Sequence, residues 1–165
     1  MLLGFYFEDY MAVGTEKAFD KVVGISREAW EGWRPANWAL HTAHRPSLKE
    51  LLDVGEVEVR SFSVEKTLAL RPDVIVLAKW QYQGLGPDVD RLEQSGIPIV
   101  VVDYNDQDLK NHVASTLLLG EITGQQARAK KIANEYKEAV ETITRRIAKA
   151  GKAKPKVYVE SGNKG

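Results

Sequence analysis

The apolar residues of this chain form short continuous runs separated by longer amphipathic stretches. Continuous runs of this length are typical of parallel strands that are covered on both faces. We expect such strands at Leu2–Phe7, Lys21–Ile25, Val74–Ala78, Ile97–Val102 and Lys156–Val159. The amphipathic stretches between them indicate helices. The alternation of strand and helix predicts an α/β lobe with three layers, Rossmann-like, built on a parallel sheet.

Local signals mark the ends of several helices. The mixed segment Glu8–Ala18 is expected to be helical with one interruption. The S-x-x-E pattern at Ser47–Glu50 is that of a capping box and predicts a small helix running to about Asp53. Ser63 is expected to cap a helix that continues to Leu70.

Three further segments complete the pattern. Ser26–Arg45 has no clear periodicity and predicts loop and short helix, whereas Val57–Arg60 is expected to form a brief strand. Pro87 suits the first turn of a helix and Gly96 its end. Two more helices follow, and they are divided at Thr123 and Gly124.

The second of these helices, residues 125–150, is unusually long. Its apolar positions keep helical spacing, at Ile132, Tyr136, Ala139, Val140, Ile143 and Ile147. At 1.5 Å per residue it would measure about 39 Å, which exceeds what a compact domain of this size needs. A helix of that length is expected where two lobes are connected. The many Lys, Arg and Glu residues along it are most simply a solvated face.

Composition narrows the classes of function. Lys plus Arg total 23 and Asp plus Glu total 23, so the zero net charge gives no electrostatic footprint for nucleic acid. No apolar run approaches the roughly 18 residues that span a bilayer. The absence of cysteine excludes a thiol nucleophile, a disulfide framework and a cysteine zinc site.

No catalytic constellation is visible in the sequence. It has no G-x-S-x-G, P-loop or H-E-x-x-H motif, and G-L-G-P-D at residues 84–88 lacks the third glycine of a dinucleotide site. No basic, apolar leader precedes the first strand. Because the chain starts directly in one expected strand and stops just after another, we expect both ends to be cut from a longer protein.

The candidate binding residues follow from one rule. In open α/β sheets, ligands bind outside the carboxyl ends of the strands. The residues behind four of the expected strands are aromatic or polar, which as a group favours binding although each alone is an ordinary loop residue. We therefore predict ligand contacts by Tyr6, Glu8, Tyr10, Arg27, Trp30, Lys79, Trp80, Tyr82, Tyr104 and Asn105.

Tryptophan and histidine are weighed separately. Trp30, Trp33, Trp38 and Trp80 are candidates for an aromatic wall, but tryptophan is usually buried, so about half are expected in the core. His41 and His44 are spaced i, i+3, but no third histidine is near in sequence, so we predict no metal site.

Several blocks together resemble one protein family. F-S-V-E-K-T-L-A-L-R-P-D-V-I-V-L at residues 62–77 looks like the signature stretch of the binding proteins that serve ABC importers of iron–siderophores, haem and cobalamin. Four other blocks, in the same order as in that family, extend the resemblance over nearly the whole chain. They are D-K-V-V-G-I at 20–25, P-S-L-K-E-L-L-D-V-G at 46–55, L-E-Q-S-G-I-P-I-V-V-V-D at 92–103 and K-P-K-V-Y-V-E-S-G at 154–162.

The resemblance implies an organisation in two α/β lobes joined by a rigid helix, with the ligand held between them. Residues 1–124 would be the N-terminal lobe, 125–150 the connecting helix and 151–165 the start of a truncated second lobe. It implies a receptor that is not an enzyme and has no resident cofactor. Its ligand would be a ferric siderophore, haem or a cobalamin-type chelate, delivered to an ABC permease and ATPase. It also implies an extracytoplasmic location, either periplasmic or anchored as a lipoprotein.

The resemblance also gives Glu65 a role. The glutamate of this V-E-K block would dock with an arginine pocket of the permease, whereas the simpler reading is a carboxylate favoured by the helix dipole. From its place in the chain we expect Glu65 at the amino edge of the sheet, opposite the ligand.

Two rival functions stay open at this point: a Rossmann-like enzyme domain and a cytosolic ligand-sensing domain. Two properties of the isolated chain are also expected. Apolar surface meant for the second lobe should cause self-association, by exchange of terminal segments. Half a cleft should bind any ligand weakly.

Overall fold

The computed structural model describes residues 1–151 and 155–158, and the side chain of Glu16 is left out of the description. Five short strands form one parallel sheet in the order β3-β2-β1-β4-β5. They are β1 (Leu2–Leu3), β2 (Gly24–Ile25), β3 (Leu52–Asp53), β4 (Ile75–Ala78) and β5 (Ile99–Val102). The register pairs Leu2 with both Gly24 and Ile75.

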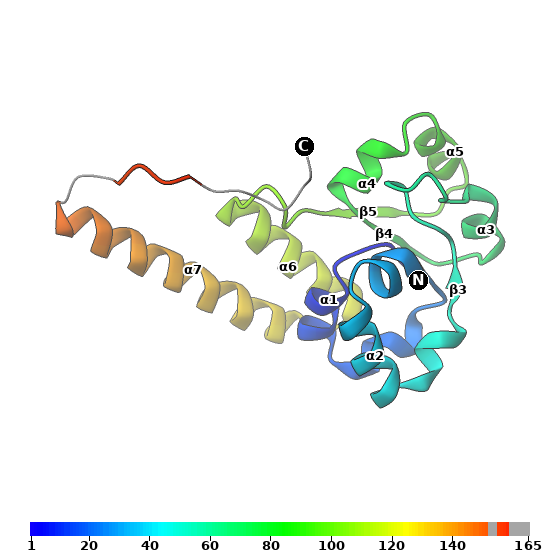
Figure 1. Cartoon of the computed structure of the whole chain (residues 1–165), viewed down its shortest axis with the longest axis horizontal. Coiled ribbons are helices and arrows are strands. Elements are labelled where there is room, and N and C mark those ends of the chain that lie inside the picture. Colours follow the sequence, from blue (N-terminus) through cyan, green and yellow to red (C-terminus); the bar gives the residue numbers. More distant parts are fainter. Residues whose placement is uncertain (152–154, 159–165) are drawn as a thin grey trace.

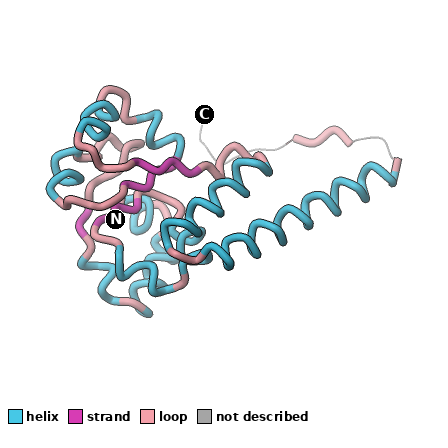
Figure 2. The backbone as a smooth tube through the Cα atoms, turned by 180° about the vertical axis from the view of Figure 1, so that it is seen from behind, coloured by secondary structure: helices cyan, strands magenta, loops and turns pink. Residues whose placement is uncertain are grey.

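Helices cover both faces of this sheet (Figures 1 and 2). Successive strand residues point to opposite faces, so Leu2, Ile75 and Leu77 join one core, whereas Leu3, Val76 and Ala78 join the other. The first core lies under α3 (Val64–Ala69), α4 (Lys79–Gly84) and α5 (Asp88–Gln94). The second core is the larger and is rich in aromatic rings. It lies under α1 (Phe7–Gly14), α2 (Pro35–His44), α6 (Leu109–Thr123) and the start of α7 (Gln126–Ala150). The three-layer α/β lobe expected from the sequence is confirmed.

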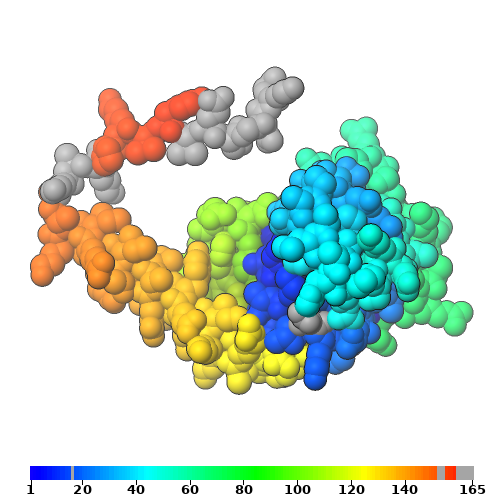
Figure 3. Space-filling view, turned by 60° about the horizontal axis from the view of Figure 1, so that its bottom comes forward, coloured from blue at the N-terminus to red at the C-terminus, as the bar shows by residue number. Residues whose placement is uncertain are grey.

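The long helix α7 is continuous and extends away from the lobe (Figures 1 and 3). Its N-terminal part packs against the lobe, with Ala129 and Ala133 buried and Tyr136 stacked on His112 of α6. A Cβ at Gly120 would lie 2.4 Å from that of Ala129, so the glycine allows α6 and α7 to approach closely. Beyond this packed part, pairs spaced i, i+4 such as Lys137–Glu141 at 3.9 Å run along the helix. The long helix expected at residues 125–150 is therefore confirmed as one unbroken element, and its role in connecting two lobes stays a prediction.

The sequence predicted the start of a helix correctly at Ser63, where a capping side chain is present. The Ser63 hydroxyl accepts the N–H of Lys66 at 3.2 Å and starts α3, as expected. The S-x-x-E segment forms a 3₁₀-helix, Pro46–Glu50, with no side-chain cap bond. Gly124 ends α6 in the left-handed conformation.

Several expected strand and helix bounds were wrong. The first strand stops at Leu3, because the left-handed backbone of Tyr6 turns the chain into α1. That helix ends at Gly14 and a 3₁₀-helix, Glu16–Lys21, follows it. Residues 57–60 form a turn, not a strand.

The segment Ser26–Arg45 contains a short π-helix, Glu28–Gly32, before α2. Of the strand expected at 156–159, residues 156–158 have no regular structure, and Val159 lies outside the described residues.

Candidate functional site

An aromatic hollow opens at the carboxyl ends of the central strands. The strand order reverses between β1 and β4, and such a switch point is where open α/β sheets bind ligands. The hollow has a volume of about 320 Å³ and is lined by Phe5, Trp33, Glu58, Trp80 and Asn105. These residues come from five separate segments of the chain, so the site exists only in the folded lobe.

Phe5 organises the aromatic walls of the hollow. Its ring centroid lies 5.3 Å from that of Trp80 and 6.1 Å from that of Trp33, both edge-to-face. The guanidinium carbon of Arg34 lies 5.3 Å from the same ring. Edge-to-face packing is a preferred geometry of aromatic pairs, so it fixes the positions of these rings. The walls therefore offer stiff apolar contact area to a ligand.

Tyr6 links the end of β1 to the end of β5. Its hydroxyl donates to Oδ1 of Asn105 and accepts the N–H of Tyr104 at 3.3 Å. Its backbone has φ 57° and ψ 48°, a left-handed conformation that costs a non-glycine residue on the order of 1 kcal/mol or more. Burial raises the pKa of this phenol, which keeps it a hydrogen-bond donor. Tyr6 thus positions Asn105 at the hollow.

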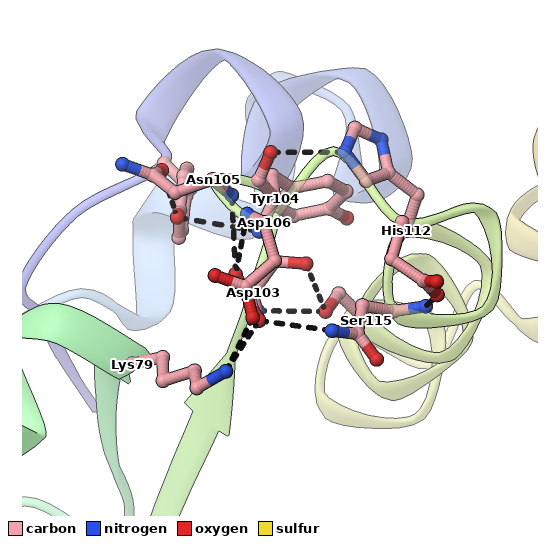
Figure 4. Close-up of polar contacts among 10 residues, drawn as sticks. Lys79, Asp103, Tyr104, Asn105, Asp106, His112 and Ser115 are labelled. Carbon is pink, nitrogen blue, oxygen red and sulfur yellow. Dashed lines mark hydrogen bonds and ion pairs between the residues drawn. The ribbon is translucent and has the colours of Figure 1, made fainter.

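A polar loop follows β5 and is centred on Asp103 (Figure 4). Oδ1 of Asp103 accepts the backbone N–H groups of Asn105 and Asp106, and Oδ2 accepts from Asn111 at 3.0 Å. Lys79 forms ion pairs with Asp103, at 3.3 Å, and with Asp106. Burial opposes ionisation of Asp103, but these hydrogen bonds and Lys79 lower its pKa overall. The loop is held by charge-assisted bonds between residues of this lobe.

Tyr104 joins this loop to the helices below it. Its hydroxyl lies 3.1 Å from that of Thr116, and its carbonyl lies 2.9 Å from Nε2 of His112. The Tyr104 ring packs edge-to-face on Tyr6 at 5.0 Å. Burial raises the pKa of the Tyr104 phenol. These contacts occupy the polar groups of Tyr104 and hold its ring between Tyr6 and α6.

Glu8 lies in the first turn of α1 and is held from α2 and the segment before it. Arg34 pairs with its Oε2 at 3.0 Å, and Asn37 donates to its Oε1 at 3.1 Å. The neighbouring carboxyl of Asp9 is partly buried, and its pKa is raised chiefly by that burial. Glu8 therefore serves first to hold Arg34 beside Phe5.

A buried polar network supports the hollow from beneath. Glu56 is fully buried behind β3, and Nε2 of Gln81 donates to both of its carboxylate oxygens at 2.9 and 3.0 Å. Gln81 also accepts the N–H of Ala78 at 3.0 Å. A Cβ at Gly4 would lie 2.7 Å from Oε1 of Gln81, so the glycine makes room for this amide. Burial raises the pKa of Glu56. The network connects the carboxyl ends of β1, β3 and β4. Its members Gln81 and Glu56 are next in sequence to Trp80 and to the 57–60 turn.

Two of the residues predicted as ligand contacts lie in the core instead. Tyr10 is 1% exposed and its hydroxyl donates to the carbonyl of Ala18 at 2.9 Å. Trp30 is 3% exposed and its ring centroid lies 3.7 Å from that of Phe7. Both follow strand ends in sequence, but the helices that they belong to turn their side chains toward the sheet. Neither can touch a ligand without unpacking the core.

Two further predicted contacts lie away from the hollow. Arg27 donates to the carbonyls of Lys49 and Leu51, at 3.0 and 2.6 Å, on the β3 side. Tyr82 packs with the opposite core, and its hydroxyl donates to Glu93 at 2.7 Å. Of the ten predicted residues, Trp80 and Asn105 line the hollow. Tyr6, Glu8, Lys79 and Tyr104 do not line it; Tyr6 is buried and bonded to Asn105, and the other three lie in the contacts described above.

The division among the tryptophans was predicted correctly. Trp30 and Trp38 are core residues, whereas Trp33 is 37% exposed and lines the hollow with Trp80. Phe5 and Glu58 were not predicted as site residues. Phe5 was assigned to the first strand, and Glu58 lies in the turn that was expected to be a strand.

Glu65 lies at the other edge of the sheet from the one expected. The N–H of Ser63, just before α3, donates to the carbonyl of Val54 at 2.8 Å, beside the carboxyl end of β3. Glu65 is exposed and pairs with Arg91 of α5 at 2.5 Å, which lowers the pKa of the carboxyl. The expectation was wrong because the helix after a parallel strand begins at the carboxyl end of that strand. Glu65 is thus on the outer layer, at the same end of the sheet as the hollow.

Two features are absent from the described residues. Within residues 1–151 and 155–158, no group of three or more His, Asp or Glu side chains is arranged to hold a metal ion. In the same part of the chain, no helix combines the length and apolarity needed to cross a membrane.

Comparison with known proteins identifies the class. The family model described as periplasmic binding protein matches residues 4–165, so the chain belongs to that family. A comparison with curated proteins gives no significant match. The family and the solved structures that resemble this chain are binding proteins rather than enzymes.

Three solved structures illustrate the likeness. The TroA-like periplasmic binding protein FepB from Veillonella parvula is 26% identical with a TM-score of 0.83, covering 90% of this chain and 43% of its own. A periplasmic heme binding protein from Pseudomonas aeruginosa is 24% identical, with a TM-score of 0.60 and coverages of 90% and 47%. The periplasmic vitamin B12 binding protein BtuF of Vibrio cholerae is 17% identical, with a TM-score of 0.57 and coverages of 89% and 50%. The chain spans about half the length of these proteins or less.

Proposed function

We propose that this lobe is part of an extracytoplasmic receptor that captures a metal chelate, such as a ferric siderophore, haem or a cobalamin, and delivers it to an ABC importer. The observation that carries the proposal is the aromatic hollow at the β1/β4 switch point, in a chain of the periplasmic binding protein family. The named relatives include proteins described as binding heme and vitamin B12, which are large chelates with extended apolar faces.

The chemistry of the hollow suits such a ligand. Trp33, Trp80 and Phe5 supply apolar area, and Asn105 supplies an amide that Tyr6 already orients. Large ligands are usually held by aromatic walls with a few placed polar groups. No proton-transfer or nucleophilic arrangement is needed for capture. We infer that a second lobe closes over the hollow, so the described lobe alone should bind weakly.

Transport requires docking as well as capture. We propose that Glu65 contributes to docking on the permease through an arginine of that partner. Its exposure and its position on the outer layer support this role, and its present partner Arg91 is itself exposed. Docking would then exchange one arginine partner for another.

The test of capture is calorimetric titration of the full-length receptor with ferric siderophores, haemin and cyanocobalamin. We expect one of these chelates to bind, and replacement of Trp80 by Ala to weaken that binding by about ten-fold, the effect of losing one aromatic contact. Tyr82→Ala is the matched control, since Tyr82 faces α5 and should leave the affinity unchanged. Failure of every chelate to bind, in a receptor that is folded, would refute the proposal.

A further inference from the structure

Within the part of the chain that the structure describes, the walls of the hollow carry a single charged side chain. Glu58 is the only charged residue, among those described, that lines the hollow, and its side chain is exposed in the turn after β3. The remaining walls are two indoles, a phenyl ring and an amide. Arg60 follows in the same turn but does not line the hollow. Among the described residues, no cation contributes to these walls.

The two cations that flank the hollow are already paired. Arg34, beside Phe5, forms its ion pair with Glu8 at 3.0 Å. Lys79, next to Trp80 in sequence, contacts both Asp103 and Asp106. The hydrogen bonds that Lys79 donates to Asp106 and Asp103 raise its pKa, so it stays protonated within that group. Neither cation is left with an unmatched positive charge for an anionic ligand.

The charged side chains around the hollow therefore have a net negative charge. Glu8, Glu58, Asp103 and Asp106 stand against Arg34, Lys79 and Arg60, which is four carboxylates to three cations. These groups are partly exposed, so the effect of each is modest and is screened by salt. Together they favour cations and disfavour anions, and the two indole faces add cation–π attraction.

We propose that the ligand presents to this lobe an apolar face that is neutral or positively charged. A ferric trihydroxamate or a cobalamin fits this description. A ferric tris-catecholate, which carries several negative charges, and haem, which carries two carboxylates, do not fit it. The inference rests on the proposed function, because it names the class of chelate for the same hollow. The second lobe supplies the other half of the contacts, so the contribution of this lobe must be measured through its own residues.

The experiment titrates the full-length receptor by calorimetry with four probes at low and high salt. Ferrioxamine B is the cationic probe and cyanocobalamin the neutral one; ferric enterobactin and haemin are the anionic probes. We expect a cationic or neutral probe to bind tightest, and the affinity for a cationic probe to fall as salt is raised.

Two variants isolate the charge of this lobe. Glu58→Gln keeps the shape of the hollow and removes its charge. It should lower the affinity for a cationic probe by about two- to five-fold, which is the usual effect of one exposed charge. It should raise the affinity for an anionic probe. Glu138→Gln, on the protruding part of α7, is the matched control and should change neither.

The outcomes separate the two proposals. Tightest binding of ferric enterobactin or haemin, with no improvement in Glu58→Gln, would overturn the charge inference and leave chelate capture intact. Absence of binding by all four probes would overturn chelate capture and the inference with it. Tightest binding of a cationic or neutral probe, with the expected response of Glu58→Gln, supports both.

Discussion

The N–H of Ser63 donates to the carbonyl of Val54 at 2.8 Å and so ties the start of α3 to the carboxyl end of β3. Glu65, two residues later, therefore faces the same end of the sheet as the aromatic hollow. A partner that covers the mouth of the cleft would also approach from this end. The position of Glu65 thus agrees with docking more simply than the opposite edge would.

Replacing Glu65 by Ala should reduce transport without reducing ligand affinity. Glu65 is exposed and does not line the hollow, so the ligand loses no contact. Loss of one member of an interfacial charge pair typically costs about 2–5 kcal/mol, because its partner is left unpaired. We expect normal chelate affinity with weak stimulation of ATP hydrolysis by the importer.

Arg91→Ala is the control for this experiment. It removes the present partner of Glu65 but keeps the carboxylate, so importer stimulation should be preserved. If Glu65→Ala instead lost ligand affinity while stimulation at saturating ligand stayed normal, Glu65 would belong to the ligand site.

Glu56 should make the protein less stable as pH rises. Its pKa in the folded state is raised from the ordinary 4.5 by burial, so the folded state binds more protons than the unfolded state above that value. The stability associated with protonated Glu56 is complete below pH 4.5 and is lost as pH rises through the folded pKa. Urea unfolding at a series of pH values measures this slope.

The variant Glu56→Gln should remove that part of the slope. Its free energy of unfolding, relative to the native sequence, should rise with pH over the same window. Glu50→Gln, an exposed carboxyl nearby in sequence, should leave the slope unchanged. Equal slopes for the native protein and Glu56→Gln would show that the buried carboxyl does not titrate in this range.

The His112 ring should couple the long helix to the binding loop. It stacks on Tyr136 of α7, with centroids 5.2 Å apart and planes 12° from parallel, and its Nε2 contacts the Tyr104 carbonyl. We expect His112→Ala to cost about 1–2 kcal/mol of unfolding free energy. A double-mutant cycle with Tyr136→Ala should give a coupling of at least about 0.5 kcal/mol.

Tyr158→Ala is the control in this series. Tyr158 is 84% exposed, so its replacement should leave the free energy of unfolding unchanged. Strict additivity of His112→Ala and Tyr136→Ala would mean that the stacked geometry carries no energy.

The 165-residue chain on its own should self-associate. Ile143 and Ile147 are 58% and 63% exposed on α7, and an apolar groove of about 560 Å³ lies where Val113, Ala114 and Leu117 of α6 face Lys137. Exposed apolar surface of this extent favours association. Light scattering should give a mass above that of a monomer at high concentration, and the double variant I143K/I147K should lower it. A monomer throughout would contradict the prediction.

Two features of the sequence were sufficient for the fold. Continuous apolar runs such as Val74–Ala78 identified strands buried on both faces, and the period of Ile132, Tyr136 and Ile143 identified the long helix. The Ser63 cap could be predicted for the same reason, because capping depends on residues that are neighbours in the chain. These patterns are local, so no knowledge of the packing was needed to interpret them.

The site depended on contacts that are not local. Tyr10 and Trp30 follow strand ends just as Trp80 and Asn105 do, but packing buries the first pair and leaves the second pair lining the hollow. Glu58 and Phe5 gave no signal in sequence, because only the approach of the 57–60 turn to the end of β1 makes them neighbours. The sequence by itself determined the alternation of strand and helix and the long helix, but it placed Leu52–Asp53 in a helix and residues 57–60 in a strand. The tertiary structure alone decided which side chains share the hollow and which charges are already paired, because those properties depend on packing between distant segments.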